Sequence, residues 1–157
     1  MTKPKFAAIV FGFALGLLAA CGDVTELSVA TPNRMQFDQE VYPVLLRDCA
    51  FHACHGSSER FFQVFGPGRG RLAPETQPLD PATALELTHS YERARSMLNT
   101  TALRDSLLLR KPLAVSAGGT GHEGADDLGR NVYQSTLEPG YVALARWVLG
   151  AQGSVAR

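Results

Sequence analysis

Two cysteines, and the two residues that follow the second one, place the strongest constraint on this chain. Cys49 and Cys54 are separated by four residues, and Cys54 is followed directly by His55 and Gly56. Cysteines at such short spacing form a small disulfide loop, bind a metal ion or attach a cofactor covalently. The compartment in which the chain folds bears on the choice among these three.

The first 20 residues predict export. Lys3 and Lys5 give a positively charged start, residues 6–18 form an apolar run, and small residues then lead to Cys21. The run is too short and wrongly flanked for a lone transmembrane helix. The sequence Leu-Ala-Ala-Cys that ends at Cys21 resembles the lipobox of bacterial lipoproteins, which implies cleavage before Cys21 and lipidation of its thiol. An ordinary secretory signal that leaves Cys21 free is the alternative.

The predicted lipid anchor places the protein in the bacterial cell envelope, on the inner or outer membrane and facing the periplasm or the exterior. Residues 21–36 show no sustained periodicity and suit a linker, and residues 37–157 are long enough for one domain with a real core.

The 15 basic and 15 acidic residues balance, which argues against a nucleic-acid partner. If lipid occupies Cys21, then Cys49 and Cys54 remain as a pair in an oxidising compartment.

Helical patterns surround the cysteines. The first predicted helix has Asp38 as its N-cap, tolerates Pro43 near its first turn and runs into Cys49. The second has Asp80 as its N-cap and ends near Asn99. A short leucine-rich turn or helix follows over residues 106–110, and the last helix spans residues 139–150. We expect the last helix, which carries Trp147, to pack on the first.

The Cys-x-x-x-x-Cys-His motif resembles the longer form of the c-type haem attachment site, used by multihaem cytochromes of sulfate-reducing bacteria. The usual site has two residues between its cysteines. A wider series of patterns resembles the cytochrome c-like domains of exported planctomycete and myxobacterial proteins. These patterns lie at residues 41–46, 54–56, 106–113, 118–122 and 141–150.

This resemblance implies an all-α fold in which the N- and C-terminal helices pack across each other, with long connecting loops and the haem held between the helices. It also implies that Cys49 and Cys54 form the thioether bonds, that His55 is the proximal iron ligand and that a long loop supplies the distal ligand. We expect His122, which stands among glycines, to be that ligand, with Met97 as the alternative.

Three further residues are weaker candidates for the distal position, namely Met35, His52 and His89. Arg69 and Arg71 could pair with haem propionates, because a guanidinium matches a carboxylate, although such arginines are more often only solvated.

The predicted function is therefore electron transfer by an exported lipoprotein with one covalent haem c and a redox protein partner. Two alternatives remain open. One is a non-catalytic binding or structural module with a Cys49–Cys54 disulfide. The other is a zinc site built from these cysteines and one or two of His52, His55 and His122. An electron carrier is favoured over a catalyst, because the sequence has no nucleophile elbow and no paired-carboxylate signature.

Overall fold

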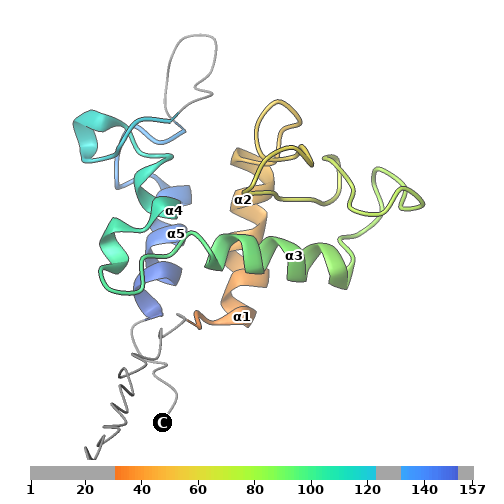
Figure 1. Ribbon diagram of the computed structural model, residues 1–157, viewed down its shortest axis with the longest axis horizontal. Helices are drawn as coiled ribbons and strands as arrows, with labels where there is room; N and C mark the ends of the chain where they lie inside the picture. The colour runs from red at the N-terminus through yellow and green to blue at the C-terminus, as the bar shows by residue number, and fades with distance from the viewer. Residues whose placement is uncertain (1–30, 123–131, 152–157) are drawn as a thin grey trace, which may run out of the picture.

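The computed structural model describes residues 31–122 and 132–151, and this part of the chain is all-α, as predicted (Figure 1). It contains no β-strand; Leu113 and Tyr133 form an isolated parallel bridge. No helix in the described part is long and apolar enough to cross a membrane. The predicted signal peptide and Cys21 lie outside the described residues.

The first helical segment is continuous and begins earlier than predicted. It comprises α1 (Arg34–Gln36), the π-helical turn η1 (Phe37–Val41) and α2 (Tyr42–Asp48). The N-cap is Asn33, whose side chain accepts a hydrogen bond from the backbone N–H of Gln36. The prediction of Asp38 as N-cap was wrong: Asp38 lies inside the segment and pairs with Arg34, with 2.9 Å between Nε and Oδ1.

The π-helical turn ends two residues before Pro43, which sits in the interior of the continuous segment. A proline there has no N–H to donate, and its ring clashes with the carbonyl four residues earlier in a regular α-helix. The backbone N–H of Tyr42 donates to the carbonyl of Phe37, a spacing of five residues. We infer that the wider turn accommodates Pro43, as π-bulges do elsewhere.

The helix α3 (Ala84–Arg95) is shorter than predicted at both ends. Its N-cap is Thr83, which forms a capping box with Glu86, and not Asp80. The sequence signal was present, because Thr83 and Glu86 have the spacing that this motif requires. The carboxylate of Asp80 instead accepts from the backbone N–H of Gln77 at 3.0 Å.

The C-terminal half agrees more closely with the sequence patterns. The 3₁₀ turns η2 (Leu103–Asp105) and η3 (Val115–Ala117) flank α4 (Leu107–Arg110), and α5 spans Pro139–Gly150 as predicted. The positions of α4 and α5 confirm the two predicted helices.

The last helix packs on the first, as expected. Trp147 of α5 is fully buried, and its ring centroid lies 5.3 Å from that of Phe37 and 6.1 Å from that of Tyr91 in α3. Its indole Nε1 donates to the backbone carbonyl of Asn33 at 2.8 Å. The three long helical segments therefore meet at one tryptophan, and this core fixes where the end of α2 lies relative to α5.

Candidate functional site

The loop after α2 folds tightly on itself. The backbone N–H of Cys54 donates to the carbonyl of Phe51 at 2.8 Å, that of Gly56 donates to the same carbonyl at 2.9 Å, and that of His55 donates to the carbonyl of Cys49 at 3.0 Å. These bonds bring Cys49, Cys54 and His55 together on one short loop.

Gly56 closes this loop for a steric reason. A Cβ atom at position 56 would collide with the backbone carbonyl oxygen of Ala50. The glycine that follows the Cys-His pair is therefore required by the close approach of two backbone segments.

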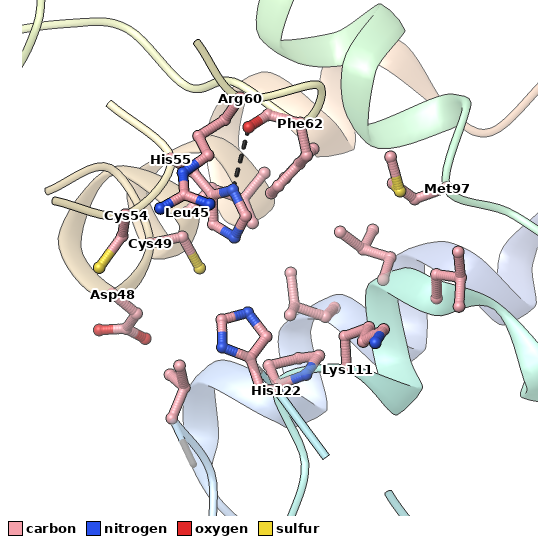
Figure 2. A pocket seen from close by; sticks show the side chains of 15 residues that line it. Leu45, Asp48, Cys49, Cys54, His55, Arg60, Phe62, Met97, Lys111 and His122 are labelled. Carbon is pink, nitrogen blue, oxygen red and sulfur yellow. Dashed lines mark hydrogen bonds between the residues drawn. The ribbon is translucent and has the colours of Figure 1, made fainter. Parts of the chain in front are cut away.

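A cavity of about 290 Å³ opens beside the loop, bounded by α2, α4, α5 and the segment that carries His122 (Figure 2). Its size is at the lower end of the range for small-molecule sites, roughly 300–1,000 Å³. Most of the lining is apolar. The lining residues are Leu45, Asp48, Cys49, Cys54, His55, Arg60, Phe62, Met97, Leu107, Leu108, Lys111, Pro112, His122, Val132 and Leu144.

Two imidazoles face each other across this cavity. The ring centroids of His55 and His122 are 5.7 Å apart, and the ring planes are inclined at 69° (Figure 2). Two imidazole nitrogens that share one metal ion at about 2.0–2.1 Å each would place the ring centroids about 6 Å apart. The spacing of the two rings is therefore close to that of a shared metal centre.

The orientation of His55 is set by Phe62. The Nδ1 atom of His55 lies 3.0 Å from the backbone carbonyl oxygen of Phe62, and the Phe62 ring packs against the imidazole with 4.8 Å between centroids. A carbonyl oxygen can only accept, so Nδ1 carries the proton and Nε2 keeps its lone pair. Metal-binding histidines are commonly oriented in this way.

Both imidazoles are held in the neutral form. Burial lowers the pKa of His55, against a smaller opposing effect of the Phe62 carbonyl, and nearby His122 and Arg60 lower it further. Burial also lowers the pKa of His122, as do the positive charges of Lys111 and Arg60. Neutral imidazole is the form that binds a metal.

Cys49 and Cys54 are both free thiols, the first buried and the second half-buried. Burial raises the pKa of Cys49 to about 12, with a further contribution from the carboxylate of Asp48. Cys49 is therefore a neutral thiol at physiological pH in the metal-free chain. Among residues 31–122 and 132–151, no group of three or more His, Cys, Asp or Glu side chains could hold a metal ion. The zinc alternative thus finds no preassembled set of ligands in this part of the chain.

The remaining candidates for the distal position lie in different surroundings. Met97 lines the cavity. His89 is half-buried elsewhere, with its Nε2 atom 2.9 Å from Oε1 of Gln63. His52 is exposed, and Met35 is 66% exposed. Neither these two residues nor His89 is part of the cavity lining.

The suggested role of Arg69 and Arg71 is not supported, because neither lines the cavity. Arg71 forms a buried ion pair with Glu86 at 2.8 Å. Arg69 donates to the carbonyl of Leu46 at 3.0 Å, and its guanidinium lies over the ring of Phe51.

The basic residues that do line the cavity are Arg60 and Lys111, which the sequence patterns did not single out. They come from separate loops, and no local pattern marks either one. The chain packing alone brings them beside the two histidines.

Comparison with known proteins identifies no relative. No protein-family model matches the chain, and neither a curated protein nor a solved structure matches it.

Proposed function

We propose that this chain is a membrane-anchored, exported electron-transfer protein that carries one covalently bound c-type haem. The observation that carries the proposal is the cavity in which His55 and His122 face each other beside Cys49 and Cys54. The residues fit the group, because both cysteines, two neutral imidazoles and an apolar wall line one cavity. Haem supplies reversible one-electron exchange at its iron.

The chain's own residues have distinct roles in this proposal. Cys49 and Cys54 form the two thioether bonds, and His55 is the proximal ligand, oriented by the Phe62 carbonyl. His122 is the distal ligand, with Met97 as the alternative on the same cavity wall. A histidine at this position favours a lower reduction potential than a methionine.

The arrangement of helices supports the same proposal at a coarser level. The first and last helical segments pack together through Trp147, and the cavity lies where the end of α2 meets α4 and α5. A cytochrome c-like fold places its haem between its terminal helices, so the cavity has a suitable position. Leu45, Leu108 and Leu144 give the cavity an apolar wall.

Arg60 and Lys111 complete the proposed site. Haem carries two carboxylates on an otherwise apolar ring, and a cationic side chain near a cavity mouth can pair with such a group. We assign this role to Arg60 and Lys111 in place of Arg69 and Arg71.

Electron transfer is the favoured role because both sides of the iron would have a protein ligand, which leaves no open position for a substrate. The proposed lipid on Cys21 would keep the carrier at the envelope membrane, where it would meet a redox protein partner.

The proposal is tested by expressing the full-length chain with a cytochrome c maturation system and recording a pyridine haemochrome spectrum and an intact mass. A c-type spectrum and the added mass of one haem are expected. The double variant Cys49→Ser, Cys54→Ser should lose covalent haem, and stable covalent attachment in that variant would contradict the assignment. A colourless protein, lighter than the reduced chain by two hydrogens, would instead establish the Cys49–Cys54 disulfide.

A further inference from the structure

A carboxylate forms part of the cavity wall on the same side as the two cysteines. Asp48 is the last residue of α2, lines the cavity, and its side chain is only 16% exposed. Figure 2 shows its carboxylate on the same side of the cavity as the side chains of Cys49 and Cys54, and Cys49 is its neighbour in the chain. The proximity is also evident in the raised pKa of Cys49, to which the charge of Asp48 contributes after burial.

Asp48 is held by Tyr133, from the segment before α5. The Tyr133 hydroxyl donates to Oδ2 of Asp48 at 2.8 Å, and the tyrosine is 3% exposed. Backbone bonds fix Tyr133 in turn: its N–H donates to the Pro112 carbonyl at 2.9 Å, and its carbonyl accepts from the N–H of Ala114 at 2.8 Å.

The first turn of α5 is shaped to admit this contact. A Cβ atom on Gly140 would lie 2.6 Å from the Tyr133 hydroxyl oxygen and 2.9 Å from Oδ2 of Asp48. A glycine is therefore needed at position 140 for the two side chains to meet where they do.

The carboxylate is ionised at neutral pH. Burial acts to raise the pKa of Asp48, but hydrogen bonds from Arg47 and Tyr133 outweigh this effect and lower the pKa below its ordinary value. Arg47 donates two hydrogen bonds to Asp48, at 2.6 and 2.7 Å, but its side chain is 64% exposed. Water screens the exposed guanidinium more than the buried carboxylate, so Arg47 offsets only part of the negative charge that Asp48 places at the cavity wall.

We propose that Asp48 lowers the reduction potential of the cofactor in this cavity, and that Tyr133 is the positioning residue that holds the Asp48 carboxylate in place. The inference rests on the proposed haem. A fixed negative charge stabilises the oxidised iron, which carries one more positive charge than the reduced iron, and so disfavours reduction. The Tyr133 hydroxyl, by donating to the carboxylate, offsets part of its field.

The test is an equilibrium redox titration of the full-length haem-loaded protein. Asp48→Asn removes the charge with little change of shape and should shift the midpoint potential to a more positive value. Asp38→Asn is the matched control, because Asp38 also pairs with an arginine on the same helical segment but does not line the cavity. The control should leave the potential unchanged. Equal potentials for Asp48→Asn and the wild type, or equal shifts in both variants, would overturn the proposal.

Tyr133→Phe tests the positioning role separately. Loss of the hydroxyl removes both an anchor of the carboxylate and a hydrogen bond that offsets its charge, so it should shift the potential in the wild-type background and leave it unchanged in the Asp48→Asn background, because Tyr133 acts through that carboxylate. The same shift in both backgrounds would overturn the positioning role. If Asp48→Asn does not fold, the Tyr133→Phe shift decides the inference alone, and its absence overturns it.

The two proposals fail in different ways. A wild-type chain that takes up no covalent haem overturns both the function and the role of Asp48. A haem-loaded wild type whose potential is insensitive to Asp48→Asn overturns only the role of Asp48.

Discussion

His55 shows how one neighbour can fix the chemistry of a side chain. Phe62 contributes its backbone carbonyl to Nδ1, and its ring packs against the imidazole in a T-shaped arrangement. The two contacts leave Nε2 as the ring nitrogen with a free lone pair. Because every residue type has a backbone carbonyl, the identity of Phe62 in the sequence could not have indicated this hydrogen bond.

We expect His122→Ala to retain covalent haem, since the thioether bonds come from other residues, but to change the coordination of the iron. The visible spectrum of the haem-loaded variant should move toward a high-spin form or an alternative ligand state. His89→Ala is the matched control, because His89 lies outside the cavity, and its spectrum should equal that of the wild type.

An unchanged spectrum in His122→Ala would remove this histidine from the iron. The distal position would then pass to Met97, which is on the cavity wall, and Met97→Leu would be the next variant to record.

Prediction from the sequence worked best where chemistry is encoded locally. Cys49, Cys54 and His55 are neighbours in the chain, and the glycines before His122 indicated a loop; the structure places all four residues on one cavity. The basic part of the lining could not be foreseen, because Arg60 and Lys111 come from separate segments whose meeting depends on tertiary packing. Arg71 was misread for the same reason, since its buried partner lies in α3.

At the scale of elements, helix ends were predicted well where one signal stood alone. Pro139 and Gly150 mark the two ends of α5 without a competing signal, and the predicted bounds are those observed. The start of α3 had two competing signals, and the capping box of Thr83 and Glu86 prevailed over Asp80. Glu86 also binds Arg71, so a tertiary contact reinforces the local motif.

Thr83→Ala should lower the free energy of unfolding by about 1 kcal/mol, the usual cost of losing an N-cap side chain. Its hydroxyl accepts from the backbone N–H of Glu86 at 3.1 Å. Asp80→Ala is the control, because the Asp80 side chain caps only an exposed turn, and it should cost less. Urea unfolding of both variants checks this ranking, and a larger loss for Asp80→Ala would contradict the assignment of the cap.

Gly56→Ala should destabilise the loop that carries the cysteines. The added Cβ would meet the carbonyl oxygen of Ala50, which belongs to the backbone and cannot rotate away. A loss of about 1–3 kcal/mol is expected, as for other cases of overpacking, and is measured by urea unfolding of the cofactor-free chain.

Gly150→Ala is the matched control for that experiment. Nothing lies within 4 Å of the added Cβ at position 150, and alanine is the better helix former. It should raise stability by about 0.5–1 kcal/mol. Equal unfolding midpoints for the two variants would mean that the loop around Ala50 relaxes without cost.

At the scale of the whole molecule, one buried ion pair organises the long connection between α2 and α3. Arg71 and Glu86 are 8% and 1% exposed, and both guanidinium-to-carboxylate bonds measure 2.8 Å. Glu86 also accepts from the backbone N–H groups of Leu72 and Thr83. Arg71 donates to the carbonyls of Gln77, Asp80 and Pro81. A segment rich in glycine and proline is thereby tied to α3 without secondary structure of its own.

This pair makes the stability of the fold depend on acid. Burial acts to raise the pKa of Glu86, but the bonds from Arg71, Thr83 and Leu72 outweigh it and lower the pKa from 4.5 to about 2. A carboxyl group whose pKa is lower in the folded state stabilises that state above its unfolded pKa, and the stabilisation is lost as pH falls through the folded pKa. The difference corresponds to stability on the order of 3 kcal/mol at neutral pH, which should disappear between about pH 4.5 and pH 2.

Glu86→Gln isolates this contribution, because it removes the titrating group and leaves Arg71 buried without its counter-charge. The variant should be less stable at neutral pH by about 3–5 kcal/mol, the usual cost of breaking a buried pair, and should lose less further stability below pH 4.5.

Trp147, the only tryptophan, is fully buried among the helices, so its fluorescence reports global unfolding. Glu92→Gln, on the same helix with a 48% exposed side chain, should behave like the wild type. Parallel acid profiles for Glu86→Gln and the wild type would show that other carboxylates govern acid unfolding.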